Sequence, residues 1–222
     1  MIVGVLAIQG DVPEHRRALL RHLPQSDVRL VRDVSDLDGV DALFLPGGES
    51  TAIAKLLIGS GMWARLAQRL DEGMPALGTC AGLILLARSI EPSPGGSDPP
   101  SFERLDVTVR RNDYGPQRES FEGEVTVKGL KGPAFPGIFI RSPKIVRVGP
   151  DAEVIARRGG EVVGVREGPV WGLTFHPELS DDPRLVGEFL RSAKAALAHR
   201  SSTRTKATTT MVATSPATTA SQ

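Results

Sequence analysis

The sequence has few of the residues that would assign it to a specialised class of protein. Its 222 residues include one cysteine, Cys80, so the chain cannot form an internal disulfide or a cysteine-rich zinc site. No apolar run approaches the roughly 18 residues that a membrane-spanning helix needs. Lysine and arginine (27) balance aspartate and glutamate (26), which gives no electrostatic basis for binding nucleic acid or an anionic membrane. We therefore expect a soluble, cytoplasmic protein with no metal site and no cofactor.

Composition changes near the carboxyl end. Residues 201–222 contain eight Thr and four Ser, no acidic residue and few large apolar residues. Such a segment buries too little apolar surface to offset the entropy lost on ordering it. We predict a single domain over residues 1–200, followed by a disordered tail over residues 201–222.

The order of apolar segments predicts the fold. Apolar runs at residues 2–8, 28–31, 42–45 and 76–78 alternate with helical patterns that begin after Asp11, at Ser50 or Thr51, and at Leu83, the last ending at Ala87. Alternating strands and helices predict an α/β fold of three layers, with helices on both faces of a mostly parallel central sheet. Beyond Leu105, β-branched segments separated by Gly and Pro predict antiparallel strands at residues 107–109, 124–127, 137–140, 154–156 and 162–165. A closing helix is expected over residues 183–199.

Cys80 lies in the sequence GTCAG (residues 78–82), between a predicted strand and a predicted helix. This is the thiol counterpart of the G-x-S-x-G elbow, in which a strained turn holds the nucleophile above the sheet edge. The backbone N–H of Ala81 would then face a developing oxyanion. A lone cysteine is more often a small buried apolar residue, but glycines at both flanking positions favour the nucleophile.

A cysteine nucleophile needs a base and a group that orients the base. Of the four histidines, His15 and His22 fall in an arginine-rich helix and are expected to face solvent, and His199 borders the tail. His176 follows an apolar strand directly, at the sheet edge where an elbow cysteine would lie. In extended backbone, Glu178 would project on the same side as His176.

A third motif, LPGGEST at residues 45–51, joins a predicted strand to a helix. Its two glycines allow backbone N–H groups to converge on an anion. The motif lacks the G-x-x-x-x-G-K-[ST] pattern, so it is not a P-loop.

These motifs in this order resemble the class I (triad) glutamine amidotransferases, which have a flavodoxin-like fold. A finer resemblance, to the glutaminase subunits of pyridoxal 5′-phosphate synthase, is carried by GVLAIQGD (4–11), LPGGEST (45–51), GTCAGLILLA (78–87), RRN (110–112), SFEG (120–123), FIRSP (139–143) and FHPEL (175–179). It extends from residue 2 to residue 199.

The resemblance implies hydrolysis of L-glutamine to L-glutamate and ammonia. It implies that Cys80 attacks the carboxamide, that His176 transfers protons and that Glu178 orients His176. The backbone N–H groups of Gly48 and Ala81 would form the oxyanion hole. The positions implied to hold glutamine are Gly48, Glu49, Ser50, Arg111, Ile140 and Arg141. The implied partner is PdxS, the (β/α)₈ synthase subunit, which would take up the ammonia for vitamin B6 biosynthesis.

Two other interpretations remain open from the sequence. The chain could be the glutaminase component of another amidotransferase, or a non-catalytic α/β thiol protein that acts as a regulatory module. The last interpretation predicts a reactive Cys80 with no need of His176 and Glu178, so release of glutamate from glutamine separates it from the others.

Overall fold

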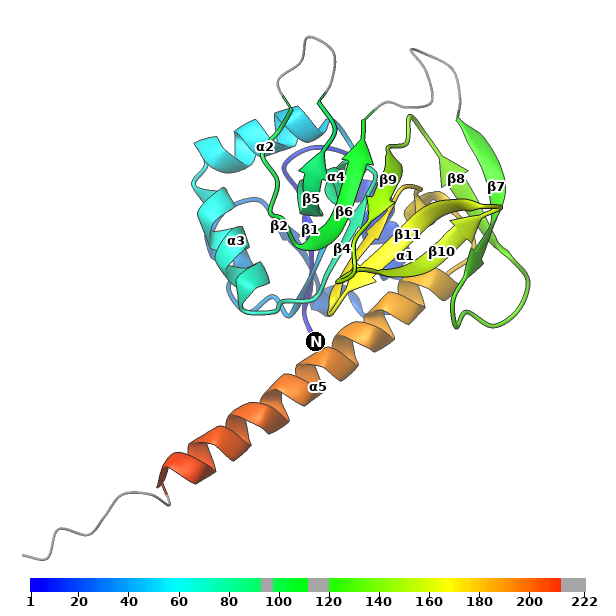
Figure 1. Ribbon diagram of the computed structural model, residues 1–222. Helices are drawn as coiled ribbons and strands as arrows, with labels where there is room; N and C mark the ends of the chain where they lie inside the picture. Colours follow the sequence, from blue (N-terminus) through cyan, green and yellow to red (C-terminus); the bar gives the residue numbers. More distant parts are fainter. Residues whose placement is uncertain (93–97, 112–119, 213–222) are drawn as a thin grey trace, which may run out of the picture.

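A nine-stranded mixed sheet forms the centre of the computed structural model, which describes residues 1–92, 98–111 and 120–212. The strand order is β2-β1-β3-β4-β12-β11-β10-β7-β8, and a smaller sheet has the order β5-β6-β9 (Figure 1). Neighbouring strands from β2 to β12 pair in parallel, and neighbouring strands from β12 to β8 pair antiparallel. The strands are β1 (Val3–Leu6), β2 (Val28–Val31), β3 (Ala42–Leu45), β4 (Ala76–Thr79), β5 (Ala87–Ile90), β6 (Leu105–Arg110), β7 (Phe121–Val127), β8 (Phe135–Phe139), β9 (Lys144–Val148), β10 (Glu153–Arg158), β11 (Glu161–Glu167) and β12 (Val170–Leu173).

The strands are connected by α-helices and short 3₁₀ turns. The α-helices are α1 (Val12–Leu19), α2 (Ser50–Gly59), α3 (Met62–Asp71), α4 (Ala81–Leu86) and α5 (Arg184–Val212), and the 3₁₀ turns are η1 (Gln25–Asp27), η2 (Ser35–Leu37) and η3 (Pro177–Leu179). Gly61, with φ 74°, separates α2 from α3 in the left-handed conformation that glycine adopts most readily. Across the described residues, no helix combines the length and the apolar character needed to cross a bilayer.

The two faces of the sheet bury different helices. On β3, Leu43 and Leu45 pack with the cluster that includes α2, α3 and α4, whereas Ala42 and Phe44 pack with α1 and α5 on the opposite face. This alternation is the expected consequence of the two-residue period of a strand. The predicted three-layer α/β fold is confirmed.

The antiparallel half differs from the prediction in detail. Each of the five predicted segments overlaps a strand, but β9 was not predicted. Helix α4 ends at Leu86, and Ala87 begins β5, which pairs in parallel with β6. Antiparallel pairing is therefore not uniform in this half of the chain.

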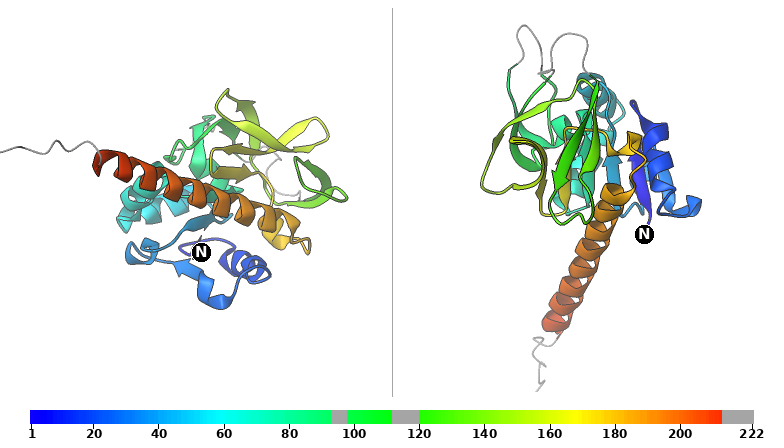
Figure 2. Two further views of the ribbon diagram at one scale, coloured as in Figure 1. Left: turned by 90° about the horizontal axis from the view of Figure 1, so that it is seen from below. Right: turned by 90° about the vertical axis from the view of Figure 1, so that its right-hand side faces the viewer.

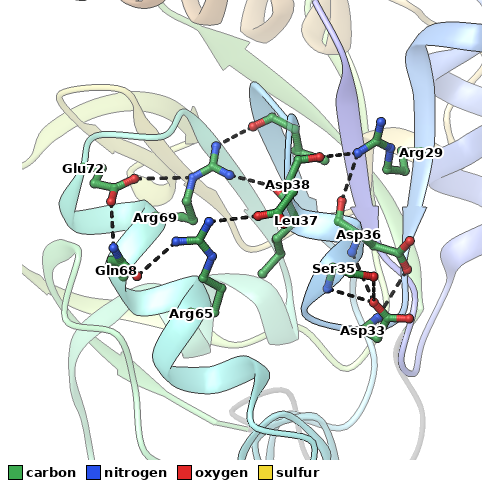
Figure 3. Close-up of polar contacts among 11 residues, drawn as sticks. Arg29, Asp33, Ser35, Asp36, Leu37, Asp38, Arg65, Gln68, Arg69 and Glu72 are labelled. Atoms are coloured by element: carbon green, nitrogen blue, oxygen red, sulfur yellow. Dashed lines mark hydrogen bonds and ion pairs between the residues drawn. The ribbon is translucent and has the colours of Figure 1, made fainter.

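Arginines on α3 tie that helix to the segment before β3. Arg69 donates to the carbonyl oxygens of Leu37 (2.6 Å) and Val40 (2.5 Å), and Arg65 pairs with Asp38 (2.9 Å) (Figure 3). These bonds satisfy carbonyl groups at the turn that leads into β3. They fix α3 against the sheet and lie away from the carboxyl end of β3.

Helix α5 is longer than the predicted closing helix. It continues to Val212, so residues 201–212, predicted to be disordered, are helical, and residues 213–222 lie outside the described residues. Figures 1 and 2 show the last turns of α5 extending away from the body. Phe189, Leu190 and Ala193, in the first third of the helix, enter the core. Further along, Arg200 donates a hydrogen bond of 2.9 Å to the carbonyl oxygen of Gly73.

Deleting residues 201–222 should leave the melting temperature unchanged, because this Ser- and Thr-rich segment has few large apolar side chains to bury. The measurement is calorimetry of the full chain and of a chain that ends at Arg200. Leu190→Ala is the matched control within the packed part of α5 and should cost about 2–5 kcal/mol. A fall of several degrees on deleting the tail would show that residues beyond Arg200 stabilise the domain.

Candidate active site

Four neighbouring parallel strands end at one edge of the sheet and bring the sequence motifs together. Gln9 follows β1, Gly48 follows β3, Cys80 follows β4 and His176 follows β12. The carboxyl ends of parallel strands are where α/β folds carry their ligand sites. The order of the strands thus unites segments that lie far apart in the sequence.

Cys80 occupies a strained turn between β4 and α4. Its φ of 49° and ψ of −103° form a conformation that side-chain-bearing residues rarely adopt. A Cβ at Gly78 would lie 2.5 Å from the backbone carbon of Gly82, and one at Gly82 would lie 2.1 Å from the carbonyl oxygen of Leu45. Both glycines are therefore required by close backbone packing. The predicted strand–turn–helix elbow at Cys80 is confirmed.

His176 is bonded to Glu178, though by a different backbone from the one predicted. Residues Pro177–Leu179 form the 3₁₀ turn η3 and not an extended segment. Within this turn the carboxylate still folds back, and Glu178 Oε1 lies 2.6 Å from His176 Nδ1. The side chain of His176 is 6% exposed and that of Glu178 is 1% exposed. His176 Nε2 is also buried and has no hydrogen-bond partner among the described residues.

The electrostatics of this pair favour a protonated imidazole. Burial lowers the pKa of His176, but the hydrogen bonds with Asp11 and Glu178, together with the neighbouring Cys80 side chain, outweigh it and raise the pKa to about 12. Burial raises the pKa of Glu178 above its ordinary value. The imidazole of His176 thus lies between the Glu178 carboxylate, which contacts Nδ1, and Cys80, which lines the same pocket.

Two residues beside His176 were not predicted to belong to the site. Asp11 Oδ2 lies 3.0 Å from His176 Nδ1. The prediction that His15 faces solvent is wrong: its side chain is 1% exposed, and its Nε2 lies 3.6 Å from Glu178 Oε2. The signal was the four-residue spacing of Asp11 and His15, which places both on one face of α1. This spacing was overlooked because the arginines of α1 suggested a solvent-exposed helix.

A pocket of about 300 Å³ opens at this edge, at the lower end of the range of about 300–1,000 Å³ typical of ligand pockets. Cys80 and His176 both line it. It also contains every position that the family resemblance implied for glutamine, together with Gln9 and Ile84, which sequence reasoning missed. The predicted lining residues are Gly48, Glu49, Ser50, Arg111, Ile140 and Arg141. A larger hollow of about 590 Å³ lies beside α5, around His22 and Arg184, away from Cys80.

The charged side chains of the pocket wall form ion pairs and hydrogen bonds with neighbouring residues. Glu49 caps α2 by accepting hydrogen bonds from the backbone N–H groups of Thr51 (3.0 Å) and Ala52 (2.6 Å). Arg111 donates to Glu49 Oε1 at 3.2 Å and lies 3.4 Å from Asp98. Arg111 and Glu49, both implied to hold glutamine, thus form an ion pair with each other. Asn112, the last residue of the RRN motif, lies outside the described residues.

The Gly47–Gly48 turn packs against the segment after β1. Gly48 has φ 149°, and a Cβ there would lie 2.5 Å from Gln9 Oε1. The same oxygen accepts a hydrogen bond from the backbone N–H of Glu49, 3.1 Å away. A Cβ at Gly47 would lie 2.5 Å from His176 Cε1. The turn therefore tolerates only glycine and lies directly beside the catalytic candidates.

Asp11, His15 and Glu178 also form a group of possible metal ligands whose atoms lie within 4.8 Å of one another. None of the three lines the pocket. Their polar atoms face His176 and one another, so we assign them no metal.

Comparison with known proteins agrees with these motifs. Residues 5–195 match the SNO glutamine amidotransferase family. The chain belongs to this family. "Pyridoxal 5′-phosphate synthase subunit PdxT" of Geobacillus thermodenitrificans is 45% identical over 88% of this chain and 97% of its own length. The protein of the same name from Mycolicibacterium vanbaalenii is 48% identical over 86% of this chain and 96% of its own length. The resemblance predicted from the motifs is confirmed.

Solved structures agree on the fold of the family. A crystal structure of a glutamine amidotransferase has a TM-score of 0.80 and 44% identity, covering 87% of this chain and all of its own. The structure of PurLQS from Thermotoga maritima has a TM-score of 0.57 at 16% identity, covering 90% of this chain and 97% of its own, which shows a shared fold alone. The α/β architecture of this family member is therefore that of a glutamine amidotransferase.

Proposed function

We propose that this chain is the glutaminase subunit of a pyridoxal 5′-phosphate synthase, which hydrolyses L-glutamine and passes the ammonia to a PdxS synthase subunit. The observation that carries the proposal is the strained Cys80 in one pocket with His176, whose Nδ1 is bonded to Glu178. Membership of the amidotransferase family, and relatives named PdxT at 44–48% identity, support the substrate and the partner.

The proposed reaction begins when Cys80 Sγ, having passed its proton to His176, bonds to the carboxamide carbon of glutamine. The carbonyl π electrons move to oxygen, and the backbone N–H groups of Gly48 and Ala81 stabilise the resulting oxyanion. Ala81 is the first residue of α4, where backbone N–H groups have no partner within the helix. His176 then protonates the leaving nitrogen, and the C–N bond breaks to give ammonia and a thioester on Cys80.

Water completes the reaction. His176 removes a proton from the water, whose oxygen bonds to the thioester carbon, and the C–S bond breaks to release glutamate and the Cys80 thiol. Glu178 stabilises the imidazolium that forms at each proton transfer. Arg111 and Glu49, at the pocket wall, are suited to the carboxylate and the ammonium group of the substrate. Ser50, Ile140 and Arg141 complete the glutamine site.

Ammonia in neutral water is mostly ammonium, which is not nucleophilic, so direct transfer to a synthase subunit preserves its reactivity. We assign catalysis to residues 1–200 and none to the tail. A cytoplasmic location fits a free thiol that must stay reduced to act as a nucleophile.

We expect glutamate production by the purified chain to rise at least about 10²-fold when the synthase subunit is added, because one oxyanion-hole donor is worth 10²–10³ in rate. The Gly47–Gly48 turn can supply such a switch, since one glycine peptide can rotate its N–H toward or away from the oxyanion. Gln9 contacts this turn, so a partner bound beside Gln9 would hold the productive orientation.

The measurement is a glutamate assay at saturating glutamine with PdxS titrated in. Cys80→Ser in the same titration is the control that assigns the glutamate to this chain. Full activity without PdxS would contradict the coupling and leave a free-standing amidase. No glutamate in either condition would favour the non-catalytic thiol module.

A further inference from the structure

The carboxylates of Asp11 and Glu178 lie between the imidazoles of His176 and His15, and these four side chains form a ring. Asp11 Oδ2 and Glu178 Oε1 contact His176 Nδ1 at 3.0 Å and 2.6 Å. The other oxygen of each carboxylate faces His15 beyond hydrogen-bond distance and has no hydrogen-bond partner among the described residues: Asp11 Oδ1 lies 3.8 Å from Nδ1, and Glu178 Oε2 lies 3.6 Å from Nε2. Each carboxylate therefore lies between the two imidazoles.

The side chain of Asp11 points into this ring and does not cap helix α1. Asp11 is the N-cap residue of α1, yet its carboxylate makes no capping hydrogen bond. A capping Asp is typically worth about 1 kcal/mol to a helix. Its orientation toward His176 is thus not explained by the stability of α1.

The ring is largely buried. The side chains of His15 and Glu178 are 1% exposed, that of His176 is 6% exposed and that of Asp11 is 20% exposed. Two neighbouring carboxylates would repel each other here unless a cationic group lay beside them, and His176, whose pKa is raised, is that group. Burial raises the pKa of Asp11, but hydrogen bonds with His176 and Glu178 outweigh it and hold the pKa below its ordinary value. Asp11 is thus the carboxylate that keeps its charge most readily.

The hydrogen bonds of His15 fix its orientation. Nδ1 lies 3.1 Å from the backbone carbonyl oxygen of Asp11, which can only accept, so Nδ1 carries the hydrogen. Nε2 faces Glu178 and, at 3.2 Å, the hydroxyl of Thr79. Thr79 directly precedes Cys80, so the ring connects α1 to the elbow.

We propose that Asp11 and His15 are positioning residues of the glutaminase: Asp11 shares the Nδ1 hydrogen of His176 with Glu178, and His15, hydrogen-bonded to the Asp11 backbone carbonyl and to the Thr79 hydroxyl, holds the start of α1 against the elbow behind both carboxylates. The inference rests on the proposed function for its kinetic consequence, although the ring itself does not. Neither residue lines the pocket. They act on catalysis through the charge and orientation of His176, not through contact with glutamine.

Asp11→Asn removes the charge and keeps the shape. In the complex with the synthase subunit we expect kcat to fall about 10–100-fold with KM unchanged, the range for one hydrogen bond to a charged group. Glu14→Gln is the matched control, because it makes the same change of charge on the same helix; it should leave kcat unchanged. A fall confined to melting temperature, or a rise in KM alone, would overturn the role of Asp11.

His15→Gln tests the other side of the ring and should likewise lower kcat while leaving KM unchanged. His22→Gln, an exposed histidine just beyond α1, is its control. If His15→Gln does not fold, Asp11→Asn and Asp11→Asn in a Glu178→Gln background still decide the proposal. We expect the double variant to lose more activity than the product of the single losses, because each carboxylate can replace the other on Nδ1.

A second readout is independent of glutamine hydrolysis. The described titratable groups that contact or act on His176 are Asp11 from the start of α1, Glu178 from η3 and Cys80 from the elbow, with His15 behind the carboxylates. Titration of ¹⁵N-labelled histidine by NMR should show a lower pKa of His176 in Asp11→Asn and no change in Glu14→Gln. Absence of glutamate from the wild-type complex would defeat the proposed function only. An unchanged His176 titration in Asp11→Asn would defeat the ring.

Discussion

Replacing Cys80 by alanine should reduce glutamate formation by about 10⁴-fold or more, in line with the removal of other nucleophiles that act with a histidine base. The thioester cannot form without Sγ, and the pocket offers no second thiol, because Cys80 is the sole cysteine of the chain. Alanine meets the same backbone strain at φ 49° as cysteine does, so we expect the fold to persist. The measurement combines single-turnover glutamate release in the presence of PdxS with a thermal melt.

Cys80→Ser serves as the matched variant, since it keeps a hydrogen-bonding side chain of similar size. Both variants should bind glutamine and melt near the wild-type temperature while failing to hydrolyse it. Activity of either within a few-fold of wild type would remove Cys80 from the mechanism.

The elbow and the pocket were predictable because their chemistry is contained in short motifs. Gly78 and Gly82 flank Cys80 because side chains there would meet the backbone of Gly82 and of Leu45, and the sequence pattern records that constraint directly. The parallel strands were equally predictable, since β1, β3 and β4 are buried on both faces and consist of continuous apolar runs.

The rest of the site depended on contacts that local pattern does not encode. His15 lies among arginines in the sequence, yet it is buried because η3, more than 160 residues away, packs on α1. Glu178 reaches His176 through a 3₁₀ turn and not through extended backbone. Strand β9 was missed because its five residues, KIVRV, show neither the strict two-residue alternation of a half-buried strand nor a continuous apolar run. Helix α5 continues through residues whose composition favours disorder, since a helix already formed propagates at little cost per residue.

The other large effect concerns Glu178, whose role follows from its burial. Its side chain is 1% exposed, and burial raises its pKa above the ordinary value. A carboxyl with a raised pKa in the folded state binds its proton more readily when folded. The folded state therefore loses stability as the pH rises above the unfolded pKa, and the ionised form at neutral pH costs free energy. That cost is consistent with a catalytic role in stabilising the imidazolium.

Glu178→Gln should therefore separate activity from stability. We expect kcat to fall between about 10²-fold and 10⁴-fold, the range for loss of an orienting carboxylate, while the melting temperature at neutral pH stays the same or rises. Asp11 still contacts His176 Nδ1 in this variant, so the loss should lie toward the lower end of that range and increase when Asp11→Asn is added. Glu124→Gln, an exposed carboxylate on β7, is the control and should change neither quantity. Wild-type turnover by Glu178→Gln would show that His176 needs no buried carboxylate from η3, and an equal fall in melting temperature would show that Glu178 is structural.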